Sequence, residues 1–124
     1  MSPRSPRSEL LGFLGLAHRA GSVVRGTEAV RTALREGSAQ LVLLAEDASD
    51  TQLKKITGLL ENREIPSAVL GSREELGGAV GGPPLAAVAL TQRTFAESFL
   101  EKLEVARGAL TRSGTEEDER TNAG

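Results

Sequence analysis

The 124-residue sequence contains no cysteine, no tryptophan and no tyrosine, and three phenylalanines are its only aromatic residues. Without cysteine the chain forms no disulfide and has neither a thiolate metal site nor a cysteine nucleophile. Phe13, Phe95 and Phe99 each fall on an apolar position of a predicted helix, which indicates core packing. An aromatic stacking platform, which many single-strand RNA-binding proteins use, is therefore not expected.

Long apolar runs are also missing from the sequence. No run approaches the ~18 apolar residues that a bilayer-spanning helix needs. Residues 1–7 are basic, but no apolar segment follows them, so we expect no signal peptide. We predict a cytoplasmic protein with no membrane partner, and nothing in the sequence requires more than a monomer.

The charge is nearly balanced, with a formal net charge of −2. A strongly electrostatic nucleic-acid binder would usually be basic, so this balance argues against that class. The charges are unevenly distributed, however, because residues 1–44 carry six arginines and only three acidic side chains. A basic face in the N-terminal half therefore remains compatible with the sequence, alongside ordinary solvated charges that have no partner.

Motifs for catalysis are absent. There is no phosphate-binding loop, no dinucleotide-binding glycine pattern and no nucleophile elbow. The single histidine, His18, suits a cation at a helix end better than a catalyst. The side chains of the adjacent acids Glu46 and Asp47 point apart, although they follow a buried strand, where α/β sheets often place ligands. We predict no catalytic residue, no metal and no cofactor.

Composition divides the chain into three parts. A basic arm covers residues 1–7, a domain covers residues 8–111 and an acidic tail covers residues 112–124. We expect a flexible arm and a disordered tail, because neither has enough apolar side chains to bury.

Helices and strands alternate within the predicted domain. Ser8, Ser49, Ser72 and Thr94 are predicted to cap helices, and Pro66 is predicted to end the third one. The expected helices cover residues 8–20, 27–36, 49–65, 73–80 and 94–111, and the expected strands cover residues 23–24, 41–45, 67–70 and 85–90. This alternation predicts an α/β fold, a three-layer α/β/α sandwich with a central mixed sheet of about four strands.

The segment from Gly26 to Asp47 is the most informative part of the chain. Gly26 opens a short amphipathic helix, Gly37 closes it, and the continuously apolar strand 41–45 follows. A glycine lets another molecule approach the backbone closely, and a first helical turn offers unpaired N–H groups at a positive dipole end. This arrangement suits a polar ligand.

Four segments in the same order resemble a known family: residues 14–21, 26–37, 41–49 and 71–77. Together they are similar to the "L-seven-Ae" ribosomal protein family, above all to its bacterial YlxQ-like members, over about residues 9–105. The resemblance implies an α/β/α sandwich that binds kink-turn RNA, a sharply bent duplex with tandem sheared G·A pairs. Such proteins use the first turn of the second helix on guanine edges and phosphates, and an apolar loop on an extruded base.

The resemblance implies a set of RNA-binding residues: Gly26, Thr27, Glu28, Arg31, Thr32, Ser49, Arg73, Pro84, Leu85 and Ala86. Three positions depart from the family pattern. Glu28 stands where the family often has asparagine, Ala29 where it frequently has glutamate, and Thr32 where it has a phosphate-facing lysine. Arg31 and Arg35 lie nearby. Such losses cost ~1–3 kcal/mol by analogy with removing a charged hydrogen-bond partner, so we expect weakened or altered RNA recognition.

Two functions follow from these observations. The first is a non-catalytic protein that binds kink-turn-like structured RNA, in the ribosome or in a regulatory RNA, with a protein partner in the same ribonucleoprotein. There the resemblance implies that Arg73 touches the RNA backbone and that Leu85 packs on a splayed base. The second is a protein-interaction module on the same fold whose RNA surface has eroded.

Overall fold

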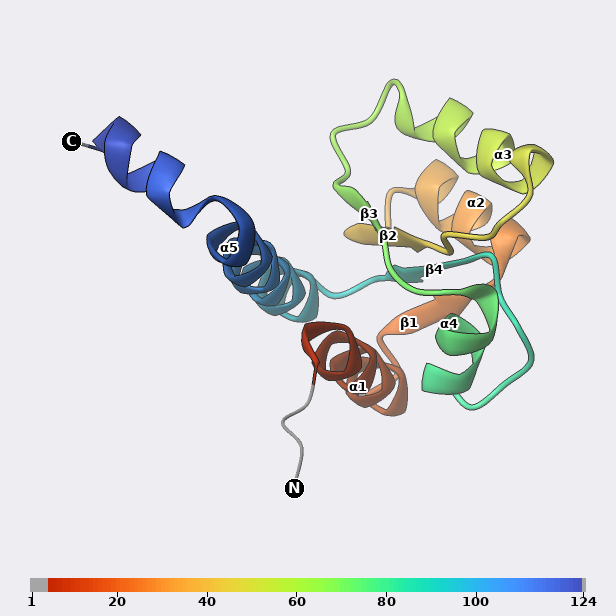
Figure 1. Cartoon of the computed structure of the whole chain (residues 1–124). Coiled ribbons are helices and arrows are strands. Elements are labelled where there is room, and N and C mark those ends of the chain that lie inside the picture. Colours follow the sequence, from red (N-terminus) through yellow and green to blue (C-terminus); the bar gives the residue numbers. More distant parts are fainter. Residues whose placement is uncertain (1–4, 124) are drawn as a thin grey trace.

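The computed structural model describes the backbone of residues 5–123 and the side chains of residues 5–108. Helices and strands alternate along this part of the chain (Figure 1). Their bounds are α1 Pro6–Arg19, β1 Val23–Arg25, α2 Thr27–Glu36, β2 Leu41–Leu44, α3 Asp50–Leu60, β3 Ser67–Val69, α4 Arg73–Ala79, β4 Ala87–Leu90 and α5 Arg93–Ala123.

The four strands form one mixed sheet in the order β1-β4-β2-β3. β4 runs antiparallel to β1 and to β2, whereas β2 and β3 are parallel. Every residue of the two central strands β2 and β4 is buried. Continuous apolar strands of this kind need cover on both faces of the sheet, and the helices provide it.

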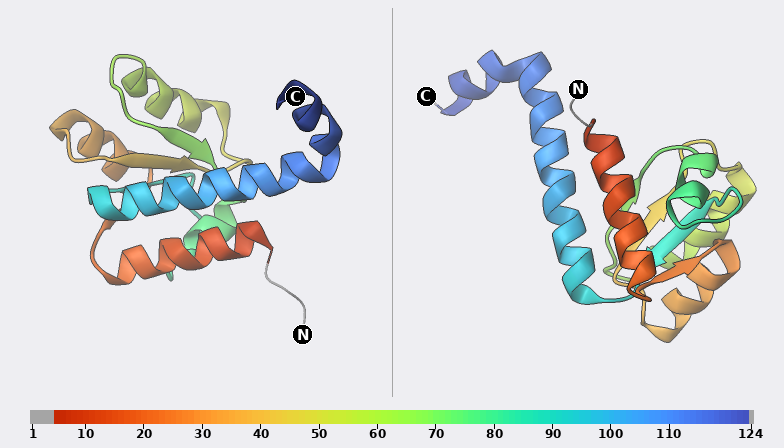
Figure 2. Two further views of the ribbon diagram at one scale, coloured as in Figure 1. Left: turned by 90° about the vertical axis from the view of Figure 1, so that its left-hand side faces the viewer. Right: turned by 90° about the horizontal axis from the view of Figure 1, so that it is seen from below.

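Helices cover both faces of the sheet, which confirms the predicted three-layer sandwich. Successive strand residues point to opposite faces, so Leu43 and Val88 join the core under α1, α4 and α5, while Val42 and Ala89 join the core under α2 and α3. Figure 2 shows α1 and α5 lying side by side on one face. The phenylalanines pack there, with the Phe13 ring centroid 5.7 and 6.0 Å from those of Phe95 and Phe99, respectively.

Three predicted helix boundaries are wrong. The N-cap of α1 is Ser5 rather than Ser8, because a proline at the first helical position suits the unpaired first turn. α3 ends at Leu60 rather than just before Pro66. The Arg63 side chain donates to the carbonyls of Leu59, near the end of α3, and of Leu34, near the end of α2. α5 begins at Arg93, which places Thr94 inside the first turn.

The chain ends bear on the predicted domain boundaries. α5 is helical through Ala123 and so overlaps the segment 112–124, which was predicted as an acidic tail, but the side chains from residue 109 onward lie outside the described residues. Residues 1–4 of the basic arm lie outside them as well. The division into arm, domain and tail stays a prediction. Within the described range, no helix combines the length and apolarity that crossing a membrane requires.

Candidate nucleic-acid interface

Gly26 joins β1 to α2 in a backbone conformation that favours glycine. Its φ is +96° and its ψ is 157°, a region that is essentially closed to residues with a side chain. The Gly26 N–H donates to the Ala87 carbonyl at 2.9 Å, which places the start of α2 beside the start of β4. A Cβ at Gly26 would lie 4.0 Å from Leu85 Cδ2, so the loop before β4 borders this glycine.

The first turn of α2 is open to a ligand. Gly26 has no side chain to cap it, and the first N–H to reach a carbonyl of the helix is that of Val30, which donates to Gly26 at 3.0 Å. The N–H groups of residues 27–29 therefore have no helix acceptor, and they carry the positive end of the helix dipole. The predicted bounds of this helix are confirmed.

Glu28 is held by two cations in this turn. Arg31 Nη1 lies 3.2 Å from one carboxylate oxygen, and Lys55 Nζ, from α3, lies 3.8 Å from the other. Arg31 Nε is buried without a hydrogen-bond partner among the described residues. Thr32 is exposed on a different side of the helix from its neighbour Arg31, since successive helical residues are about 100° apart. Arg31 is therefore paired with Glu28 and lies on a different side of the helix from Thr32; whether it compensates for a lysine at Thr32 stays a prediction.

Arg73 connects three parts of the surface. Its backbone N–H donates to Asp47 Oδ1 at 2.8 Å, and its Nε lies 3.6 Å from the same oxygen. Its carbonyl accepts from the Leu85 N–H at 3.0 Å. The end of β2, the start of α4 and the loop before β4 thus meet at one residue, whose side chain is half-exposed.

The loop between α4 and β4 is pressed against α4. The Gly82 N–H donates to the Gly77 carbonyl at 2.9 Å, and a Cβ at Gly77 would collide with the Pro83 carbonyl. Pro84 is exposed and Leu85 is half-buried at the edge of the core. Ala86 is only 6% exposed, so the structure places its side chain in the core.

Most of the predicted site residues gather at one edge of the molecule. In Figure 1 the start of α2 and the loop between α4 and β4 meet at the right-hand edge, on the opposite side from α5. We call this region the α2–α4 surface, and it comprises residues 26–32, Arg73 and residues 84–85. Ser49 is used locally, since its hydroxyl accepts from the Gln52 N–H at 3.1 Å and caps α3.

Sequence reasoning missed two basic side chains at this surface. Arg25 is exposed at the end of β1, and its Nη1 lies 3.5 Å from where a Cβ of Gly82 would stand. The position of Arg25 directly before Gly26 could have indicated it. Lys55 gave no such signal, because its approach to Glu28 depends on how α2 and α3 pack together.

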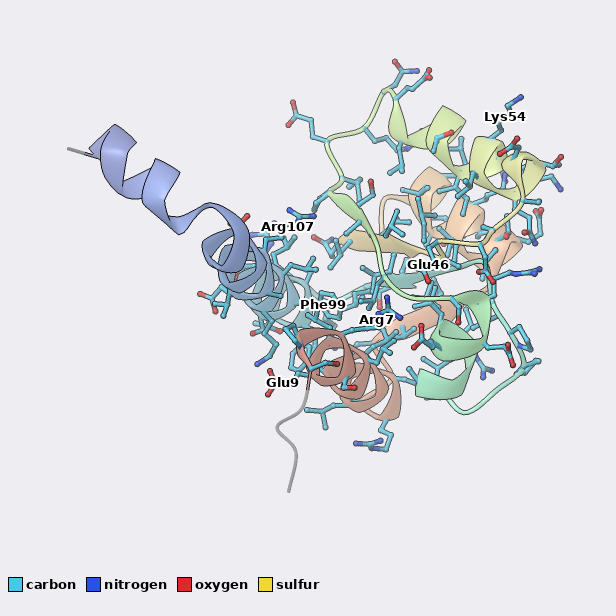
Figure 3. The ribbon with its side chains drawn as sticks, in the orientation of Figure 1. Arg7, Glu9, Glu46, Lys54, Phe99 and Arg107 are labelled. Atoms are coloured by element: carbon cyan, nitrogen blue, oxygen red, sulfur yellow. The ribbon has the colours of Figure 1, made fainter. Side chains whose placement is uncertain are left out.

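A second charged cluster ties α1 to α4. Arg7 lies 3.1 Å from Glu75 and 3.8 Å from Glu46, and Figure 3 shows Arg7 and Glu46 near the end of β2. The backbone N–H of Ser72 donates to Glu75 at 2.9 Å and is the main cause of the lowered pKa of that carboxyl. Burial opposes this shift, and the nearby charge of Arg7 lowers the pKa further. Among the described side chains, no group of three or more acids and histidines could hold a metal ion.

Sequence comparison identifies relatives. The chain is 38% identical over 96 residues to the RNA-binding protein YlxQ of Bacillus subtilis (strain 168), a match that covers 77% of this chain and 96% of the relative. The RNA-binding protein YlxQ of Enterococcus faecium is 32% identical over 77 residues, which cover 62% of this chain and 75% of the relative. Both relatives are named as RNA-binding proteins rather than as enzymes.

Solved structures and a protein-family model also match the chain. A protein of unknown function from Bacillus halodurans C superposes with a TM-score of 0.72 at 30% identity, covering 77% of this chain and 96% of the other. The 15.5kD RNA binding protein of Giardia lamblia has a TM-score of 0.67 at 19% identity, over 86% and 93% of the two chains, which shows the shared fold alone. Residues 8–99 match the family described as "Ribosomal protein L7Ae/L30e/S12e/Gadd45 family", and the chain therefore belongs to this family.

Proposed function

We propose that this chain binds structured RNA without catalysing a reaction, and that the α2–α4 surface contacts a kink-turn or a similarly bent element of a ribosomal or regulatory RNA. The observation that carries the proposal is the convergence of three features at one edge. These are the uncapped first turn of α2, the guanidinium of Arg73 and the apolar side chain of Leu85. The names of the two YlxQ relatives support RNA as the ligand class.

Each feature suits a different part of a bent RNA. Free N–H groups at a helix start donate hydrogen bonds to phosphate oxygens, and a glycine there permits close approach of the RNA backbone. Arg73 is half-exposed and can pair with a phosphate. Leu85 borders the same glycine and offers an apolar surface to an unstacked base, and unstacked bases are the parts of RNA that proteins commonly contact.

The test is a titration with a labelled kink-turn duplex. A matched duplex in which the tandem G·A pairs are replaced by Watson–Crick pairs serves as the control, and both are measured at two salt concentrations. We expect the intact kink-turn to bind more tightly than its control at both. Equal weak binding of the two duplexes would exclude kink-turn recognition. No binding to either duplex would favour the protein-interaction module.

Two arginine variants locate the surface. Arg73→Ala is expected to weaken binding about three- to tenfold and to reduce the slope of log K against log[salt] by about 0.7–0.9, because one phosphate contact is lost. Arg107→Ala is the matched control, since Arg107 is an exposed arginine on α5, well apart from α4 in Figure 3. It should change little. Equal effects of the two variants would refute the α2–α4 surface.

A further inference from the structure

Two neighbouring carboxylates at the end of β2 have different partners. Glu46 and Asp47 follow the same strand, and their side chains are 48% and 50% exposed. Glu46 lies 3.8 Å from Arg7 of α1, in the cluster that ties α1 to α4. Asp47 is instead bound to Arg73, at the α2–α4 surface. Substituting either residue therefore removes one negative charge from nearly the same place.

Asp47 holds Arg73 at two points. One carboxylate oxygen accepts the Arg73 backbone N–H at 2.8 Å and lies 3.6 Å from Arg73 Nε. Within residues 5–108, whose side chains are described, Asp47 is the only carboxylate paired with Arg73. Asp47 thus lies beside the Nε of Arg73, and the two Nη groups are at the other end of the guanidinium. The Nη groups can donate two parallel hydrogen bonds to a phosphate.

The same contact reaches the loop before β4. The Arg73 carbonyl accepts the Leu85 N–H at 3.0 Å, so the peptide groups on either side of Arg73 connect Asp47 to Leu85. A shift in the Arg73 backbone would therefore move the apolar side chain as well as the cation. One carboxylate thus fixes two of the three features that converge at the α2–α4 surface.

We propose that Asp47 is a positioning residue for RNA, which aims the guanidinium of Arg73 and holds Leu85 in place without touching the RNA itself. This inference rests on the proposed function. It predicts that removing the Asp47 carboxylate changes the RNA affinity in the opposite direction from the one that simple electrostatics predicts. A carboxylate near phosphates repels them, so removing its charge alone should strengthen binding. Removing a positioning contact should weaken it.

The experiment compares Asp47→Ala with Glu46→Ala in titrations with the kink-turn duplex. We expect Asp47→Ala to bind about three- to tenfold more weakly than the wild type, given the modest strength of half-exposed contacts. Glu46→Ala should bind equally or up to about twofold more tightly, because it removes the same charge without disturbing Arg73. Equal or tighter binding by Asp47→Ala would overturn the inference.

A cycle with Arg73→Ala separates positioning from a general loss of stability. If Asp47 acts through Arg73, Asp47→Ala should cost clearly less affinity in the Arg73→Ala background than in the wild type. Fully additive losses would contradict the inference. Circular dichroism melting establishes that each variant is folded at the assay temperature. If Asp47→Ala is not, Asp47→Asn compared with Glu46→Gln decides, with weaker binding by Asp47→Asn supporting the inference and equal binding overturning it.

The outcomes distinguish the inference from the function on which it rests. A wild-type protein that binds no RNA would remove the proposed function and the inference together. A wild-type protein that prefers the intact kink-turn, with Asp47→Ala and Glu46→Ala binding alike, would keep the function and remove only the role of Asp47.

Discussion

Replacing Gly26 with alanine tests the geometry of the α2–α4 surface most directly. Gly26 has φ +96° and ψ 157°, and no neighbouring atom comes closer than 4.0 Å to the position of an added Cβ. The substitution therefore introduces backbone strain without a steric collision. Residues held in this glycine-only region cost about 1–3 kcal/mol. We expect Gly26→Ala to lower the free energy of unfolding by that amount.

Gly37→Ala is the matched control at the other end of the same helix. Gly37 has φ +77° and ψ 16°, and an added Cβ would meet nothing within 4 Å. A left-handed conformation costs an L-residue roughly 1–2 kcal/mol, so both variants should lose stability to a similar degree. Only Gly26 adjoins the first turn of α2 and Leu85. Relief of strain there moves the proposed contacts, whereas relief at Gly37 leaves them in place.

The assay has two parts. Denaturation followed by far-ultraviolet circular dichroism gives the free energies of unfolding, because a chain without tryptophan or tyrosine has little intrinsic fluorescence to follow. Titration with the kink-turn duplex gives the affinities. We expect Gly26→Ala to bind at least about fivefold more weakly, which corresponds to about 1 kcal/mol, and Gly37→Ala to bind as the wild type does.

Two results would refute this reasoning. Unchanged stability of Gly26→Ala would mean that the backbone there does not need glycine. Equal affinities of the two variants, with both destabilised, would mean that the start of α2 is not where the RNA binds.

The remaining predictions concern the α4–β4 loop and acid stability. Gly77→Ala should displace that loop, because the new Cβ collides with the Pro83 carbonyl, and we expect at least about 1 kcal/mol of lost stability in denaturant melts together with weaker RNA binding. Glu75→Gln tests the lowered pKa, whose main cause is the Ser72 N–H. Since the folded-state pKa lies below the unfolded value of about 4.3, the charged form stabilises the fold above that pH and this contribution is lost as pH falls through the folded value. Wild-type and Glu75→Gln melting temperatures should therefore differ at pH 7 and converge as the pH falls through the lowered folded-state pKa.

The fold could be predicted because its signals are local. α2 has a glycine at each end and an amphipathic pattern between them, so its bounds are visible in the sequence. β2 is apolar at every position, which indicates cover on both faces. The end of α3 was missed because Arg63 reaches the carbonyl of Leu34 on another helix, and no local pattern encodes that contact.

The candidate site was only partly predictable, because local patterns do not encode contacts between separate elements. The glycine, the arginine and the apolar loop residue can be named from the sequence, but the contacts that join them cross between elements. The hydrogen bond from Leu85 to Arg73 joins a loop to a helix start, and Asp47 reaches Arg73 from the end of a strand. Ala86 shows the limit in the other direction, because this residue beside the loop proves to be buried.

The ion pairs determine how this surface could gain affinity for RNA. Arg31 and Lys55 already face Glu28, whereas Asp47 makes its hydrogen bond to the backbone N–H of Arg73 and lies 3.6 Å from its Nε. A phosphate that approaches Arg31 or Lys55 must therefore compete with a carboxylate of the same chain, so binding exchanges one anion for another and releases few counterions. The salt slope should then be shallow, set chiefly by Arg73 and by the exposed Arg25. Discrimination between RNAs would rest on the fit of a bent backbone to the uncapped turn of α2, because salt screens the hydrogen bonds of neutral N–H groups less than it screens contacts between exposed charges.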